Sequence, residues 1–169
     1  MTFTVGGKHR LSRALTGLLV VCAVFTTGCL TATGGGWIPS AFTPTDKATF
    51  GFTARCRTMQ QNGNSVAELY DGQLEWHDGP VRIHGKVEPV VFLTQPELCG
   101  DVSLPGLLSF GGTYEPQDGG LGGFFEVQVE DLGEPGKISG DFISIKLVGV
   151  EHGGYTNMGT LRGGNIQVQ

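Results

Sequence analysis

Two short runs in which apolar and polar residues alternate, Phe124–Glu130 and Ile143–Leu147, constrain the fold of this chain more than any other feature. In both runs every second residue is apolar, and a period of two is typical of a β-strand that buries one face. The connection between the runs, residues 131–141, contains Gly133, Pro135 and Gly136, which disfavour a helix. The stretch therefore predicts two strands joined by a glycine-containing connection.

Glycine limits helices in the rest of the chain as well. Of the 29 glycines, 25 follow Cys29, and the longest run without Gly or Pro is Phe52–Asn62. A helix of ordinary length has little room between these residues. We therefore expect eight or nine short strands at intervals of about ten residues, which predict an all-β fold. Both a single antiparallel β-sandwich and a partly closed β-barrel fit this pattern.

Three further strands are predicted from alternation. They are Lys47–Arg57, Leu107–Tyr114 and Asn165–Gln169. In the second of these, Gly111-Gly112 predicts a bulge. The polar segment Met59–Ser65 contains turn residues and is predicted to be a loop.

The segment Tyr70–Val87 predicts a hairpin around Asp78-Gly79. Folding the chain there places Trp76 opposite Val81, Leu74 opposite Ile83 and Glu75 opposite Arg82, so that the inner pairs are apolar and the outer pair is charged. Because proline lacks an N–H group, Pro80 predicts a connection slightly longer than a two-residue turn.

Residues 1–28 have the layout of an export signal. Three basic residues precede the apolar run Ala14–Phe25, and no acidic residue occurs before Asp46. The run is shorter than the roughly 20 residues that a transmembrane helix needs. We expect residues 1–28 to be removed, residues 29–36 to form a flexible tether and residues 37–169 to form a single β-domain.

The pair Gly28-Cys29 resembles the end of a bacterial lipoprotein signal, in which a small residue precedes the cysteine that receives lipid. It predicts lipidation of Cys29 and a domain anchored to the outer face of the cell membrane. Cleavage near Ala32-Thr33-Gly34 is an alternative that would release a secreted protein. In a third interpretation Cys29 is simply a small residue at the end of the apolar run.

Cys56 and Cys99 are the cysteines that remain in the predicted domain. Two cysteines in an oxidising compartment usually pair, so we expect a disulfide between them. The chain-entropy model gives such a bond a stabilising effect of about 4 kcal/mol. Two unpaired buried thiols are the alternative, and two cysteines alone are too few ligands for zinc.

The charge of the chain argues against nucleic acid as a partner. The formal net charge is −5, and loss of Lys8, Arg10 and Arg13 with the leader changes it to −8. Nucleic-acid binding requires a basic patch that displaces counterions from phosphates. An acidic domain of this kind is also not expected to dock on anionic lipid, which leaves the lipid anchor as its predicted contact with the membrane.

The histidines do not form a recognisable site. His77 and His84 flank the predicted hairpin turn on its outward face but on different rungs, and His152 lies in a glycine-rich loop. Solvent-exposed histidines explain this pattern more simply than a zinc or catalytic pair.

Candidate nucleophiles and acids are equally unspecific. The sequence around Ser109 and Ser144 contains no nucleophile motif. Glu126 and Glu130 resemble a hydrolytic pair, although alternate outward positions on a strand are typical of a solvated face. The sequence therefore predicts no catalytic residue.

Asp131, Glu134 and Asp141 form the one candidate metal site. They are spread over a glycine-containing connection, and calcium takes six to eight oxygen ligands of the kind that such loops supply. Their spacing does not match an EF-hand loop. Gly133, Pro135 and Gly136 are explained more simply as ordinary turn residues, and no cofactor other than this candidate calcium is predicted.

Seven short segments occur in a fixed order along the chain: Gly34–Ile38, Lys47–Phe52, Gly72–Trp76, Val81–Gly85, Asp131–Gly136, Asp141–Ile145 and Gly163–Val168. Together they resemble a family of exported bacterial β-domains labelled post-COAP domains, most of which lack an assigned activity. The resemblance covers nearly all of the predicted mature chain and implies export and an all-β fold. It carries no catalytic residue to this sequence. Leu132 and the Cys56/Cys99 pair depart from the usual pattern of the family.

These observations predict a non-enzymatic β-domain at the cell surface or secreted, which binds an envelope or extracellular protein or a glycan through its loops and sheet faces. A structural component of the envelope is the first alternative, and a hydrolase is the second. An exposed apolar patch would favour a binding module, whereas a concave pocket that gathers His77, His84 or the acids would favour an enzyme.

Overall fold

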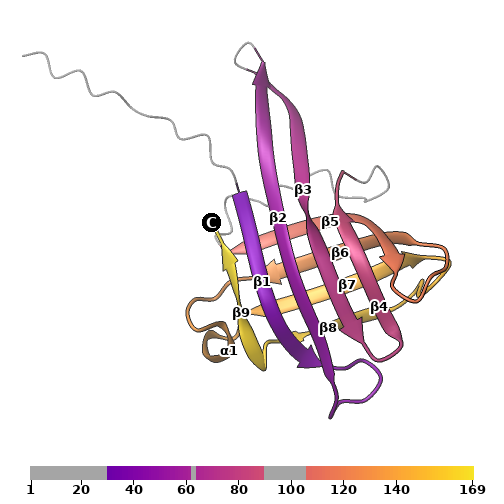
Figure 1. Ribbon diagram of the computed structural model, residues 1–169. Helices are drawn as coiled ribbons and strands as arrows, with labels where there is room; N and C mark the ends of the chain where they lie inside the picture. Colours follow the sequence, from indigo (N-terminus) through magenta and orange to yellow (C-terminus); the bar gives the residue numbers. More distant parts are fainter. Residues whose placement is uncertain (1–29, 62–63, 90–105) are drawn as a thin grey trace, which may run out of the picture.

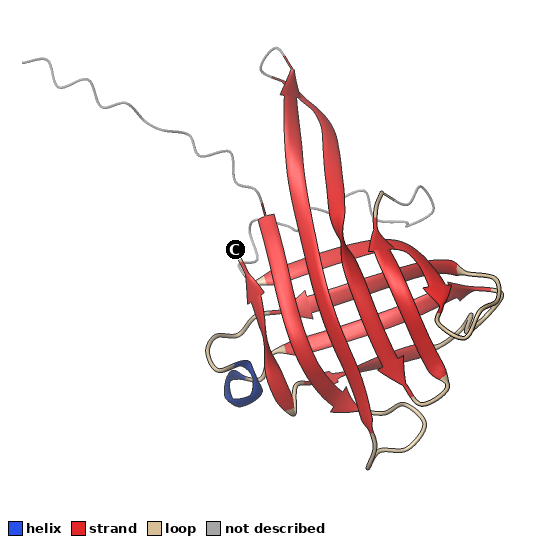
Figure 2. Ribbon diagram, in the orientation of Figure 1, coloured by secondary structure: helices blue, strands red, loops and turns tan. Residues whose placement is uncertain are grey.

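The computed structural model of the protein describes residues 30–61, 64–89 and 106–169, and places the side chains of residues 31–55, 71–89 and 106–169. Nearly all of this chain is strand (Figure 2). The strands are β1 Leu30–Pro39, β2 Lys47–Gln61, β3 Asn64–Asp78, β4 Val81–Val87, β5 Leu107–Pro116, β6 Gly123–Glu130, β7 Phe142–Gly149, β8 Thr156–Thr160 and β9 Gly163–Val168, and a short helix, α1 Gly136–Ser139, precedes β7.

All nine strands form one antiparallel sheet in the order β8-β7-β6-β5-β4-β3-β2-β1-β9. The sheet curls into a half-barrel (Figure 1). Its two edge strands, β8 and β9, approach each other at one end, where Leu161 and Arg162 connect them. There the Arg162 N–H donates to the Trp37 carbonyl (3.0 Å) and the Asn157 amide donates to the Pro39 carbonyl (3.1 Å). The predicted all-β class is confirmed, in the form of a partly closed barrel.

The inner face of the half-barrel is filled with large apolar side chains. Trp76, Tyr114, Phe110 and Phe125 are almost completely buried, together with aliphatic residues from every strand except β8. Aromatic rings contact one another across the interior, with the Phe50 and Trp76 ring centroids 5.9 Å apart. Burial of this apolar area is the main stabilising contribution to the fold. The interior is a packed core.

The two strands that the alternation pattern predicts most clearly are confirmed. In the pairing of β6 with β7, Phe125 lies opposite Leu147 and Val127 opposite Ile145, and all four side chains are buried. The outward partners include Glu126 and Lys146, whose charged atoms are 3.6 Å apart. The period of two therefore gives the correct strands and faces here.

The predicted register of the β3–β4 hairpin is wrong by two residues. Trp76 lies opposite Ile83, and Asp78 opposite Val81, so that Gly79-Pro80 is a two-residue turn. Gly79 has φ 55°, which suits the first central position of a primed hairpin turn. Pro80 occupies the second position, whose N–H is not needed by the ladder. A shift of two keeps the inward and outward faces as predicted.

Two segments expected to be flexible or looped are strand. Residues 30–36, most of the predicted tether, belong to β1, which pairs with β2 on one side and β9 on the other. Most of the predicted loop Met59–Ser65 also continues the β2–β3 hairpin, in which Gln61 lies opposite Asn64. Pairing on both edges explains why a glycine-rich segment is ordered in β1, since neighbouring strands supply the hydrogen bonds that fix it.

Two smaller predictions also change. The β5–β6 register is continuous through Gly111 and Gly112, so the predicted bulge is wrong. A Cβ atom on Gly112 would lie 1.9 Å from the Lys86 carbonyl oxygen, so this glycine permits close approach of β4 instead. The strand β8 was not predicted, because Thr156–Thr160 lacks apolar alternation.

Candidate functional site

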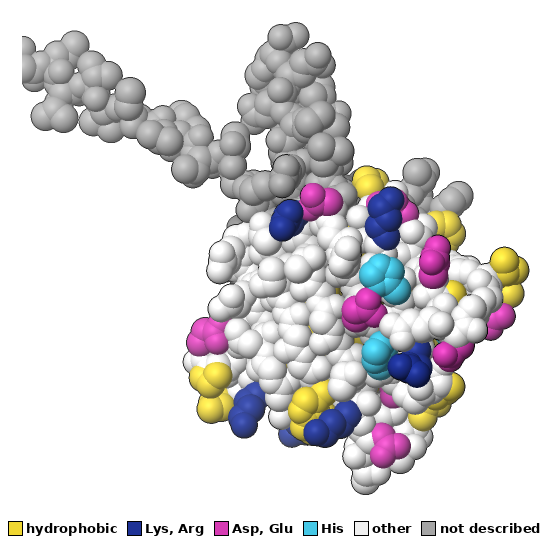
Figure 3. Space-filling model, in the orientation of Figure 1, with side chains coloured by type: hydrophobic (Ala, Val, Ile, Leu, Met, Phe, Trp, Pro, Cys, Tyr) yellow, Lys and Arg dark blue, Asp and Glu magenta, His cyan; other side chains and the backbone are white. Residues whose placement is uncertain are grey.

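The outward side chains of β3, β4 and the end of β5 form a polar group that we call the outer-face cluster: Glu75, His77, His84 and Gln117. Their inward neighbours Leu74, Trp76 and Ile83 are fully buried, which fixes the strands beneath the cluster. Figure 3 shows two histidines on either side of an acidic side chain on this face. The cluster therefore stands on the central, best-packed part of the sheet.

Hydrogen bonds link the four side chains. The Gln117 amide nitrogen donates to Glu75 Oε2 at 2.9 Å and lies 2.9 Å from His77 Nε2. Glu75 Oε1 bonds to His84 Nδ1, and Glu75 Oε2 lies 3.9 Å from His77 Nε2. The side chains of His77, Glu75 and His84 are 41%, 47% and 48% exposed. The cluster is thus organised internally and still open to a ligand.

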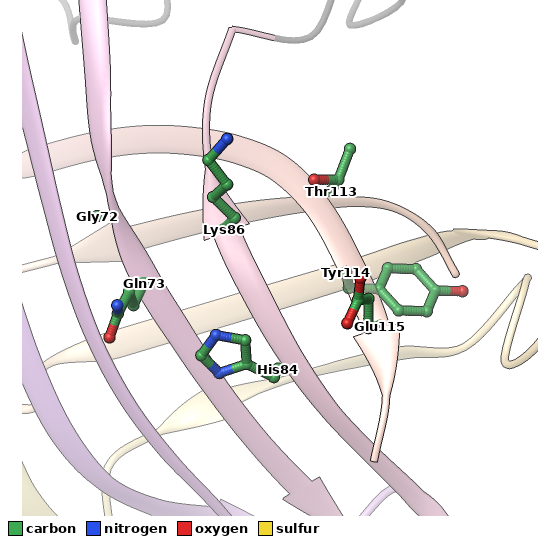
Figure 4. Close-up of a pocket in the computed structure, with 7 residues that line it drawn as sticks. All are labelled: Gly72, Gln73, His84, Lys86, Thr113, Tyr114 and Glu115. Atoms are coloured by element: carbon green, nitrogen blue, oxygen red, sulfur yellow. The ribbon is translucent and has the colours of Figure 1, made fainter. Parts of the chain in front are cut away.

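A shallow hollow of about 420 Å³ adjoins the cluster. Figure 4 shows its lining residues, with the His84 ring and the Gln73 amide facing the same space and Lys86, Thr113 and Glu115 at its upper and far sides. Hydroxyl, amide, imidazole, ammonium and carboxylate groups all line it. These groups offer both donors and acceptors to a polar ligand.

Lys86 is held at the rim of this hollow. Its ammonium lies 2.7 Å from Glu88 Oε2, and the Thr113 hydroxyl donates to Glu88 Oε1 at 2.5 Å. The hydrogen bond from Lys86, followed by that from Thr113, lowers the pKa of Glu88 below its ordinary value. The three side chains join β4 to β5 on the outer face and position the ammonium group beside the hollow.

The acids and histidines of this face lie on the half-exposed outer surface of the sheet. His77 and His84, which were expected to be solvent-exposed, share a carboxylate partner, Glu75, which the sequence did not indicate. Within the parts of the chain that the structure describes, no group of three or more potential metal ligands is present.

Asp131 and Asp141, two of the predicted calcium ligands, instead form what we call the carboxylate clasp. Asp141 is fully buried and accepts the N–H groups of Leu132 (3.0 Å) and Ile166 (2.9 Å). Asp131 accepts the N–H group of Val168 (3.0 Å) and that of Gly133 (3.0 Å). The clasp therefore ties the connection between β6 and β7 to the free edge of β9, which hides that edge.

Glu134, the third predicted calcium ligand, lies in the same connection but faces solvent. Its Oε1 accepts hydrogen bonds from Asn165 Nδ2 (2.6 Å) and Gln167 Nε2 (2.8 Å), both on β9. N–H donors thus occupy oxygens of all three acids in the described structure. Calcium binding stays a prediction, and a fall in melting temperature on adding a chelator would support it.

The remaining candidate residues are not brought together with the cluster. Ser109 and Ser144 both flank Gln128, on β5 and β7, and a glutamine amide is not a general base. Glu126 pairs with Lys146 at 3.6 Å. Glu130 lies further along β6 and His152 in the loop before β8, with φ 61°.

A buried polar network at one end of the half-barrel was missed by the sequence analysis. Asp78, fully buried, accepts the Tyr155 hydroxyl (2.6 Å) and the Ala41 N–H (2.9 Å) at Oδ2, while Trp76 donates to the Tyr155 oxygen (2.9 Å). Burial and then the bond to Asp78 raise the pKa of Tyr155 above its ordinary value. Asp78 was assigned only to a turn, because the pattern gave no sign of its partner Tyr155.

An exposed apolar patch lies at the loops next to β6 and β7. Leu121, Val148 and Val150 are 66%, 46% and 73% exposed, and the Glu151 N–H bonds to the Leu121 carbonyl (3.4 Å), which joins the two loops. Such patches are found at protein interaction surfaces.

The predicted lipidation and disulfide sites are outside what the structure describes. Cys29 and Cys99 lie outside the described residues, and for Cys56 the structure gives only its backbone position in β2, opposite Tyr70. Both predictions therefore stay predictions.

Comparisons with known proteins add no family assignment. No family model, no curated protein and no solved structure matches the chain. The described residues contain no helix long and apolar enough to cross a membrane.

Proposed function

We propose that this protein is a non-enzymatic binding module of the bacterial cell surface, exported and held by a lipid at Cys29, which binds a protein or glycan of the envelope through the outer face of β3, β4 and β5. The observation that carries this proposal is the outer-face cluster, in which Glu75 bonds both to His84 and to Gln117 beside an open hollow. Preorganised, half-exposed polar groups on a rigid sheet bind a ligand with little loss of side-chain entropy.

The packed interior supports a binding surface on the outside. Large side chains such as Trp76 and Phe110 fill the half-barrel, so a ligand would be recognised by the outer face and the loops. The resemblance to exported post-COAP domains and the layout of residues 1–28 support export. The alternatives are a secreted form cleaved near Gly34 and a structural envelope component.

Binding can be tested with protein purified from cells and washed bacterial envelopes. The double substitution Glu75→Ala/His84→Ala removes the cluster, and Glu126→Ala/Lys146→Ala removes a matched acid–base pair on the outer face of β6 and β7. We expect the first variant to co-sediment with envelopes at least about tenfold more weakly, as loss of one or two hydrogen bonds implies, and the second to behave like the unmodified protein.

Two results would contradict the proposal. One is equal sedimentation of both double variants. The other is release of small products from the envelopes by the unmodified protein and not by the Glu75 variant, which would identify an enzyme. The intact mass of the protein from cells tests the anchor separately: a lipid-modified start at Cys29 is expected, whereas an unmodified start near Gly35 would show secretion.

A further inference from the structure

We infer that the ligand of this face is an uncharged polysaccharide that lies across the strands, along a row of residues from Asn165 on β9 to Glu115 on β5. This inference rests on the proposed function and names the class of ligand. The strand registers place six residues on one rung of the outer face, in the order Asn165, Gly35, Gly51, Glu75, His84 and Glu115.

The middle of this row is open because Gly35 and Gly51 lie opposite each other without side chains. A Cβ atom on Gly51 would have no neighbour within 4 Å, so the space above it is free. Figure 3 shows the same region, over β1 and β2, as a flat area of uncharged side chains and backbone. The outer-face cluster and the hollow of Figure 4 close one end of it. The result is a strip of sheet surface without side chains, which we call the open strip and which leads to polar groups.

The rungs on either side supply the contacts that sugars use. On one side Trp37 and Thr49 are paired, followed by His77. The Trp37 ring is half-buried, and Lys47 Nζ lies 4.5 Å from its centroid. On the other side Thr33 and Thr53 are paired. Lys47 covers the face of the Trp37 ring, so the sugar contacts come from the hydroxyl, amide and carboxylate groups of these rungs, which can bond to sugar hydroxyls.

Charge favours an uncharged ligand. The outward residues of β2 to β5, with Glu88, include four basic and four acidic side chains: Lys47, Arg55, Arg82, Lys86, Asp71, Glu75, Glu88 and Glu115. The other residues whose side chains the structure places include nine acids and three bases. The acidic protein repels a polyanion at long range, and the balanced face itself offers a polycation no excess of negative charge. Its alternating donors and acceptors match hydroxyl groups, which both donate and accept.

The length of the row suits a chain rather than a single sugar. Five strand spacings of about 4.8 Å give roughly 24 Å, which is room for several sugar units. A polymer that contacts the Trp37–Thr49 rung, the open strip and the Glu75–His84 pair at once gains affinity from each contact. The hollow alone would admit only one end of it.

The substitution Gly51→Gln tests the open strip without disturbing the core, because the new side chain enters open space at an outward position. Thr160→Gln adds the same side chain at an exposed position on β8 and is the control. Affinity electrophoresis of the purified full-length protein in gels with soluble glucan, mannan or galactan measures binding, with polygalacturonate as the anionic counterpart. We expect at least one neutral polysaccharide to bind, Gly51→Gln to weaken this at least tenfold with an unchanged melting temperature, and Thr160→Gln to have no effect.

Three results would overturn the inference. One is a Gly51→Gln variant that binds the neutral polysaccharide as tightly as the unmodified protein, and another is a preference for polygalacturonate. The third is the absence of polysaccharide binding while envelope binding still depends on Glu75 and His84; the ligand would then be of another class and the proposed function would stand. If envelope binding does not depend on these two residues, the proposed function itself fails.

Discussion

The carboxylate clasp and the outer-face cluster are both groups of acidic and polar residues on the same sheet, but the central acid of the clasp is buried and that of the cluster is half-exposed. Asp141 is fully buried, and both of its oxygens accept backbone N–H groups. Glu75 is 47% exposed and bonds only to other side chains. A buried carboxylate with complete hydrogen bonding holds the fold together, whereas an exposed one can exchange its partners for a ligand. The surroundings of an acid, more than its presence, indicate its role.

The largest expected effect is that of Asp141→Ala. It leaves the buried N–H group of Ile166 and the partly buried N–H group of Leu132 without partners, at about 1 to 3 kcal/mol each. The free energy of unfolding, measured by urea denaturation, should fall by about 2 to 6 kcal/mol. Glu130→Ala, at a half-buried position on β6, is the control. A loss below 0.5 kcal/mol, within about the range of ordinary surface substitutions, would show that the clasp is not structural.

Tyr155→Phe tests whether burial has the same consequence in a second network. The variant leaves Trp76 without its acceptor and removes one donor to Asp78, so we expect a loss of about 1 to 3 kcal/mol. Because the pKa of Tyr155 is raised in the folded state, its contribution is present below its ordinary value of 10 and is lost as the pH rises through the folded pKa. Tyr114→Phe, whose hydroxyl bonds to an exposed loop carbonyl, should lose less.

Glu75→Ala/His84→Ala is the reciprocal test on the exposed side. Both side chains are about half-exposed, so their loss should change the free energy of unfolding by less than about 0.5 kcal/mol even though binding falls. Thermal and urea unfolding of the variant beside the unmodified protein would measure this. If stability and binding fell together, the cluster would be a structural element like the clasp.

The smallest expected effect concerns Glu88. Lys86→Met removes the first cause of its lowered pKa, so the pKa of Glu88 should rise toward 4.5. Since the pKa of Glu88 is lowered in the folded state, the pair stabilises the protein fully above pH 4.5. This contribution is lost as the pH falls through the lowered pKa. Carboxyl-carbon NMR titration would detect the change. An unchanged titration would show that Thr113 alone sets the pKa.

Sequence patterns predicted the sheet better than the site. Alternation in β6 and β7 was sufficient to predict both strands, because one face of each is buried. The hairpin register failed because a glycine with positive φ allows a two-residue turn that the missing N–H of Pro80 seemed to exclude. The segment 30–36 failed because glycine indicates flexibility only where no neighbouring strand pairs with it.

The candidate site could be predicted only in part, because its residues are joined by strand pairing rather than by spacing. His77 and His84 were placed correctly on the outward face, but Gln117 is 40 residues from His77 and reaches it through the pairing of β4 with β5. The Gly35–Gly51 pair and its continuation to Glu75 require the registers of three strands. No local pattern contains that information.

The position at which pairing begins sets how far the domain could stand from a membrane. Leu30 is already opposite Cys56 in the sheet. An acyl chain attached to the preceding residue would therefore have no flexible linker between it and the sheet. Such a protein would lie close to the bilayer rather than at the end of a long linker. It would sample only polymers that pass next to the lipid headgroups, and a few inserted Gly-Ser residues would be enough to extend its range.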